Sequence, residues 1–79
     1  MASAPQPKGY PINPISYGDY LRCKRMESNF TQSDLATILG VYKSTIDKWE
    51  RGIIKPNKYN KKQIINFLGY DPIKQTISI

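Results

Sequence analysis

The strongest chemical signal in this chain is a surplus of positive charge between residues 43 and 62. This stretch holds seven lysine or arginine residues and two acidic ones, and the whole chain has a net charge of +6. Basic side chains gathered in this way attract phosphates and other anions. The stretch is therefore a candidate surface for nucleic acid, although an ordinary solvated basic face would give the same count.

A helix predicted at about residues 42–51 would turn part of this charge to one side. Its apolar residues Ile46 and Trp49 fall on one face by helical spacing, and Trp49 is expected to be core. In a helix docked in the major groove of DNA, the N-terminal residues of the other face reach the bases. Lysine can donate to guanine O6 and N7, and serine can donate or accept. The base-reading candidates are therefore Lys43, Ser44 and Lys48.

Asp47 lies on the same face, and two roles are open to it. It could accept a hydrogen bond from cytosine N4. It could instead pair with Lys43 and Arg51, which lie four residues to either side. The pairing is favoured, because an unpaired carboxylate near DNA phosphates is unfavourable.

The region from Thr31 to Gly52 predicts two short helices joined by a tight turn. Thr31 and Asp34 match a capping box, and Gly40 suits the left-handed conformation that ends a helix. Ala36 is small enough to lie where the two helices cross. The apolar side of the first helix is expected to be Leu35, Ala36, Ile38 and Leu39, and the wedge between the helices to be filled by Leu35, Val41, Ile46 and Trp49.

Two further helices are predicted on either side of this pair. Ser16 and Asp19 match a second capping box and begin a helix at about residues 17–28. The other helix runs over about residues 58–68 and stops at Gly69. The ordered domain is therefore expected at residues 16–72.

The two ends of the chain have different compositions from this domain. Residues 1–15 hold four of the six prolines, which predicts a flexible arm, or one that touches DNA or the domain. In the tail, residues 73–79, isoleucines alternate as in a strand. Such a tail must pair with a second copy, pack on the domain or remain loose.

The composition also excludes several classes of protein. A chain of 79 residues forms one small domain, and it has no histidine and a single cysteine. No apolar run approaches a membrane span, and no secretory signal is evident. The sequence therefore predicts a cytoplasmic protein that is not an enzyme and has no cofactor, metal site or evident small-molecule substrate, and a DNA-binding role would make it nucleoid-associated.

Several of these motifs resemble one known family. The chain is similar to the Cro/repressor-type helix-turn-helix family of bacterial and phage transcription factors, in particular to small members associated with mobile elements. The resemblance covers roughly residues 16–72. It rests on Thr31-Gln32, Leu35-Ala36, Leu39-Gly40-Val41, Ser44-Thr45-Ile46, Trp49-Glu50-Arg51-Gly52 and Lys55-Pro56.

The resemblance implies an all-α domain of four or five helices that binds double-stranded DNA in a sequence-specific way and regulates transcription by occupying its site. It also implies a structural ion pair between Arg25 and Glu50. Tyr42 departs from the family pattern, because a serine or threonine usually caps the recognition helix there. The predicted contacts to the DNA backbone are Thr31, Gln32, Tyr42, Arg51, Lys55 and Lys58.

Pairing of two copies on DNA is expected, since dimers of this kind read half-sites about one helical turn apart. Two alternatives remain open at this point. The fold also serves as a protein-interaction module, and a mobile-element accessory factor would bind DNA to shape a recombination complex. An accessory factor would need the same groove contacts as a repressor, whereas an interaction module would tolerate charge reversal on the exposed face of the helix at about residues 42–51.

Overall fold

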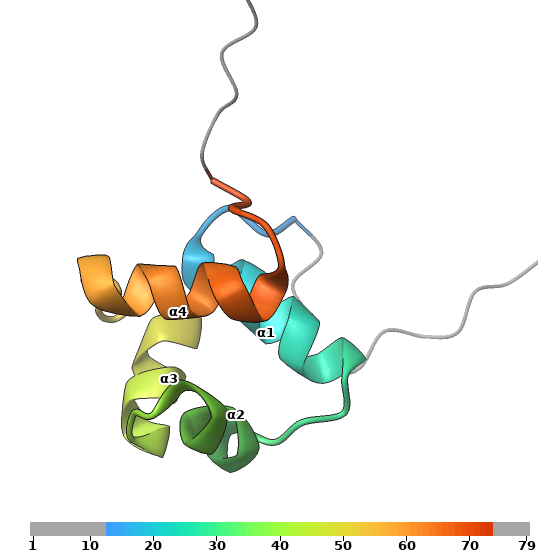
Figure 1. The fold of residues 1–79 in the computed structure, drawn as a ribbon, viewed down its shortest axis with the longest axis vertical. Helices are drawn as coiled ribbons and strands as arrows, with labels where there is room; N and C mark the ends of the chain where they lie inside the picture. Colours follow the sequence, from blue (N-terminus) through green and yellow to red (C-terminus); the bar gives the residue numbers. More distant parts are fainter. Residues whose placement is uncertain (1–12, 74–79) are drawn as a thin grey trace, which may run out of the picture.

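The computed structural model describes residues 13–73, which form four α-helices. They are α1 (Tyr17–Glu27), α2 (Gln32–Leu39), α3 (Lys43–Glu50) and α4 (Lys58–Leu68). In Figure 1, α2 and α3 lie together below α4, and α1 crosses behind α4. The all-α fold is confirmed, with four helices in the described part of the chain.

The predicted helix starts are present as capping boxes. The Ser16 side chain accepts from the Asp19 N–H at 3.1 Å, and the Thr31 side chain accepts from the Asp34 N–H at 3.0 Å. In both boxes the aspartate accepts from the backbone of the cap residue in return. These contacts satisfy backbone donors that a helix start otherwise leaves unpaired.

Both α1 and α3 are followed by a residue in the left-handed conformation, which turns the chain away from the helix. The sequence signals this turn clearly only after α3, where the residue is a glycine. Gly52, with φ of 74°, follows α3, and the Ile53 N–H donates to the Lys48 carbonyl at 2.9 Å. Asn29, with φ of 60°, does the same after α1, where the Phe30 N–H donates to the Arg25 carbonyl at 3.0 Å. Asparagine tolerates this left-handed conformation, but glycine is its usual marker.

One side chain from each helix is completely buried and forms the centre of the core. These four residues are Leu21, Leu35, Ile46 and Ile64. Trp49 and Ala36 are also buried, as predicted, with 3% and 6% of their surface exposed. The core therefore joins all four helices and fixes α3 from its inner face.

Ile38 is the error in the predicted core, because 51% of its surface is exposed. Leu35, Ala36 and Leu39 are the buried residues of α2 and already cover its inner stripe. At 3.6 residues per turn, Ile38 lies about 110° from the centre of that stripe. An eight-residue helix packed on one side leaves such a position in solvent.

Gly18 marks the closest approach between α1 and α3. It is buried, and a Cβ atom added there would meet the carbonyl oxygen of Trp49 inside any normal contact distance. The next nearest atoms are also backbone atoms of α3. Only glycine therefore allows the start of α1 to lie against the C-terminal turn of α3.

Most of the predicted N-terminal arm and nearly all of the tail lie outside the described residues. Of the arm, Ile15 is described, and its N–H donates to Asp19 Oδ2 at 3.0 Å. None of the described helices has the length and hydropathy needed to cross a membrane. Residues 13–73 also contain no group of three or more side chains placed to hold a metal ion.

Candidate nucleic-acid interface

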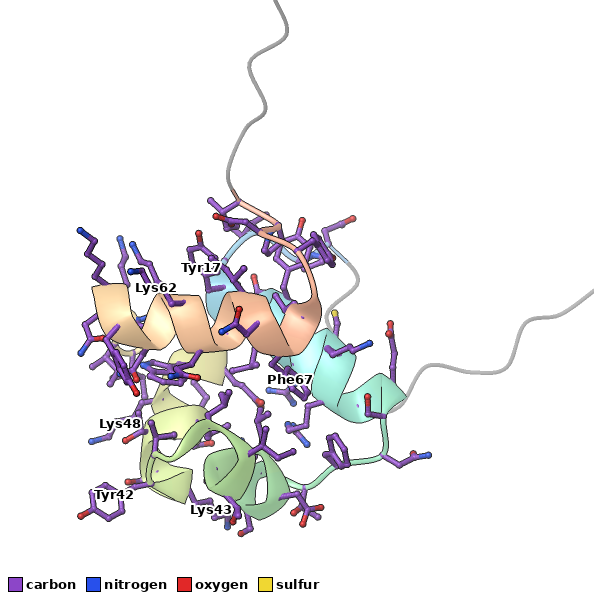
Figure 2. All side chains as sticks on the ribbon, viewed as in Figure 1. Tyr17, Tyr42, Lys43, Lys48, Lys62 and Phe67 are labelled. Carbon is purple, nitrogen blue, oxygen red and sulfur yellow. The ribbon has the colours of Figure 1, made fainter. Side chains whose placement is uncertain are left out.

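The outer face of α3 presents the predicted base-reading residues to solvent. Lys43, Ser44 and Lys48 are all exposed. Figure 2 shows Tyr42, Lys43 and Lys48 directed away from the other helices. The arrangement follows from the sequence, because Ile46, Trp49 and Glu50 occupy the buried face. One face of α3 is therefore held by the core while the other is available to a ligand.

Tyr42 precedes α3 as its N-cap and makes no capping hydrogen bond with its side chain. The ring is 80% exposed. A tyrosine hydroxyl lies too far from its own backbone to replace a serine or threonine cap. The side chain is therefore placed at the N-terminal end of the exposed face, beside Lys43.

The structure brings Arg25 and Glu50 together in a two-pronged ion pair. Arg25 Nε lies 2.7 Å from Glu50 Oε2, and Arg25 Nη2 lies 2.9 Å from Glu50 Oε1. The Glu50 side chain is completely buried and that of Arg25 is 13% exposed. Arg25 Nη1 also donates to the Phe30 carbonyl at 3.0 Å. These contacts tie α3 to α1 and to the loop before α2.

Gln32 connects this buried pair to the exposed face of α3. Its Nε2 donates to Glu50 Oε1 at 3.1 Å and to Asp47 Oδ1 at 3.4 Å. The side-chain nitrogen of Gln32 is thus directed at two carboxylates of the protein. The sequence predicted a DNA-backbone contact for Gln32 and did not reveal these two hydrogen bonds. The capping box uses the N–H groups of Thr31 and Asp34. At the start of α2, the N–H groups of Gln32 and Ser33 are therefore left for an anion.

Asp47 pairs with Arg51 within α3, which confirms the more favoured of its two predicted roles. Arg51 Nη1 donates to Asp47 Oδ2 at 3.2 Å, and both side chains are partly exposed. The hydrogen bonds from Arg51 and Gln32 lower the pKa of Asp47 below its usual value of 3.8. Lys43 contributes charge attraction, but the described structure shows no ion pair between Lys43 and Asp47. Asp47 is therefore ionised and oriented at neutral pH.

The remaining basic candidates flank α3 on its C-terminal side. Lys55 lies in the loop after α3, and Lys58 is the first residue of α4; both are exposed. The two acidic residues of the 43–62 stretch are Asp47 and Glu50, and both have arginine partners. Glu50 is buried and its partner Arg25 lies outside the stretch, whereas Asp47 still offsets Arg51 within it. The exposed surface is therefore more basic by one charge than the sequence count alone indicates.

A contact that the sequence did not reveal joins the two ends of the described chain. The Tyr17 hydroxyl donates to Asp71 Oδ1 at 2.9 Å across 54 residues of sequence. Partial burial, followed by the hydrogen bond and the negative charge of Asp71, raises the pKa of Tyr17 above 10.0. No local pattern signals such a pair, because its partners meet only after α4 has packed on α1.

Tyr17→Phe should lower the free energy of unfolding by about 1 kcal/mol or less, the usual net value of one hydrogen bond. Because the folded-state pKa is raised, this stabilisation is present below pH ~10 and is lost as the pH rises through the folded pKa. Urea unfolding at pH about 7 and about 11 measures it. Tyr59→Phe, at a ring that is 66% exposed, is the control. A difference between Tyr17→Phe and the original chain that stays constant over this pH range would contradict the assignment.

The chain is similar in sequence to known helix-turn-helix proteins. The chain is 36% identical over 58 residues to a protein of Pyrobaculum aerophilum named "Putative HTH-type transcriptional regulatory protein". The match covers 73% of this chain and 23% of that protein, so the chain spans about a quarter of its relative's length. No solved structure gives a significant match. The sequence model of the helix-turn-helix family matches residues 21–75. The chain therefore belongs to the Cro/C1-type helix-turn-helix family of DNA-binding domains, whose members are typically not enzymes.

Proposed function

We propose that this protein binds double-stranded DNA in a sequence-specific way and regulates transcription by occupying its site. The observation that carries the proposal is the two-faced character of α3. Its inner face is held by Ile46, Trp49 and the Arg25–Glu50 pair, while its outer face presents exposed polar and basic side chains. A rigid helix of this kind suits the major groove of DNA. The name of the Pyrobaculum relative, a putative transcriptional regulator, supports the same function.

In this proposal the exposed residues divide into two groups. Lys43, Ser44 and Lys48 read base edges, because they lie on the outer face of α3. The other group holds the phosphates and sets the register of α3 in the groove. It consists of Thr31, the N-terminal end of α2 at Gln32, Tyr42, Arg51, Lys55 and Lys58.

Selection from a random duplex library at near-physiological salt tests the proposed function. A recovered motif would support sequence-specific binding. A two-fold symmetric motif with half-sites about one helical turn apart would also support a homodimer on DNA, which we propose for this domain. A folded protein that recovers no motif would overturn the proposal and would favour a protein-interaction module or a non-specific architectural factor.

Lys48→Ala should weaken binding to the selected site more than binding to random DNA. A lysine that donates to guanine supplies discrimination, and its loss should cost about 1–3 kcal/mol on the selected site. Fluorescence anisotropy with both duplexes at the same salt concentration measures the two losses. Equal losses would make Lys48 a phosphate contact.

Lys58→Ala is the matched control for this experiment, because it removes the same charge at the start of α4. Binding to both duplexes should weaken alike. The slope of log K against log salt should become shallower by about one unit. A loss confined to the selected sequence would contradict the role of Lys58 at the backbone.

A further inference from the structure

An open pocket of about 370 Å³ lies between the start of α1, the end of α3 and the loop into α4. Its lining includes the buried residues Gly18, Trp49 and Pro56. Its size is at the lower end of the range for small-molecule sites. The volume of the pocket equals that of roughly a dozen water molecules. The DNA-binding role proposed above does not account for it.

The lining of this pocket is apolar with cations at its edge. Ile15, Ile54 and Ile73 come from three separate segments and contribute apolar surface, and each is exposed. Lys55 and Lys61 are the charged residues of the lining, which includes no aspartate or glutamate. The Lys61 ammonium group lies 5.7 Å from the centre of the Tyr17 ring, which holds it at the pocket. The lining therefore complements a molecule with an apolar body and a negative charge.

We propose that this pocket binds a small amphipathic anion, such as a medium-chain or aromatic carboxylate. Its apolar body would lie against Trp49 and the three isoleucines, and its carboxylate would lie between Lys55 and Lys61. Burial of apolar surface supplies most of the affinity, and the two lysines select the anion over a neutral molecule of the same shape.

Occupancy of the pocket would also oppose DNA binding, and this part rests on the proposed function. Lys55 is a proposed phosphate contact and also lines the pocket. A bound carboxylate would compete with phosphate for Lys55 and would add a negative charge beside the DNA backbone. The ligand is therefore expected to lower DNA affinity without entering the face of α3.

Octanoate is the probe for this proposal, with 1-octanol and octylamine as the neutral and cationic controls. Trp49 is the sole tryptophan of the chain and lines the pocket, so its fluorescence reports binding directly. We expect saturable binding of octanoate with a dissociation constant of about 1 mM or tighter. Octanol should bind more weakly, and octylamine should show no saturable change. Amide NMR shifts should concentrate in residues 15–18 and 52–61.

Two pairs of variants separate the roles of charge and of apolar contact. The double variant Lys55→Gln/Lys61→Gln should weaken octanoate about fivefold and leave octanol unchanged. Lys62→Gln is the control, because this lysine is exposed on α4 outside the pocket (Figure 2). Ile54→Ala should weaken both probes, while Ile53→Ala, at the neighbouring exposed residue outside the pocket, should weaken neither.

Three results would overturn the proposal: no saturable binding of octanoate, equal binding of octanoate and octanol, or NMR shifts centred elsewhere. Failure of the proposed DNA-binding function would look different, because octanoate would still bind and follow the variants while no duplex bound. If DNA does bind, octanoate should lower its affinity in the original chain, and about fivefold more octanoate should be needed for the same effect in the double variant. A duplex affinity that octanoate leaves unchanged would overturn the competition.

Discussion

Replacing Glu50 by alanine should remove most of the stability of the domain. Glu50 is buried and accepts hydrogen bonds from both Arg25 and Gln32. Without it, the Arg25 guanidinium keeps the Phe30 carbonyl as its described partner but has no counter-charge there. Removing one partner of a buried ion pair costs about 3–5 kcal/mol. A small single domain has only about 5–15 kcal/mol in total, and this one is near the small end.

Urea or thermal unfolding followed by circular dichroism measures this loss. Asp47→Ala is the matched control, because Asp47 lies one turn earlier on α3 and accepts from Gln32 as well, but in a partly exposed position. Its effect should be much smaller. The double variant Arg25→Met/Glu50→Leu should recover much of the loss, since apolar residues of similar size can replace a buried pair. A stable Glu50→Ala protein would show that solvent reaches this pair.

Gly18→Ala should destabilise the domain by about 2 kcal/mol, although alanine is the better helix former. The new methyl group would meet the backbone carbonyl of Trp49, which cannot move aside as a flexible side chain would. Relief requires α1 to shift away from α3, and overpacking of this kind typically costs 1–3 kcal/mol or more. The gain in helix propensity, about 1 kcal/mol, offsets only part of this cost.

Gly40→Ala separates this steric cost from the loss of glycine's conformational freedom. Gly40 has φ of 71° and open space around its Cα, so its substitution should cost about 1–2 kcal/mol from backbone strain alone. The same unfolding measurement serves both variants. If Gly18→Ala were as stable as the original chain, the close packing of α1 on α3 would be wrong.

The fold could be predicted closely because its signals are local. The capping boxes at Ser16 and Thr31, the left-handed Gly40 and the spacing of Ile46 and Trp49 each act over a few residues. The failure at Ile38 has a local cause as well, because apolar character alone does not say which stripe of a short helix finds a partner. The apolar type of Ile38 can be read from the sequence. The side of α2 on which α3 and α4 pack cannot, and that side decides whether Ile38 is buried.

The contacts within the candidate interface were harder to predict, because they depend on packing between distant segments. The Arg25–Glu50 pair was expected only from a family resemblance. The Tyr17–Asp71 contact, the close approach at Gly18 and the two carboxylates bound by Gln32 had no signal in the sequence. Each of these contacts joins two segments that are distant in the sequence. The spacing of apolar residues predicts single helices and not how two of them pack together.

The polar chain that runs from Arg25 through Glu50 and Gln32 to Asp47 determines how the specificity of this domain can be altered. Lys43, Ser44 and Lys48 are exposed and make no side-chain hydrogen bond or ion pair among the described residues, so they can be exchanged for other residues without disturbing the interior. Asp47 is bound through Gln32 to the same carboxylate that fixes α3. A library built to retarget this domain should therefore randomise those three positions and keep Asp47 constant.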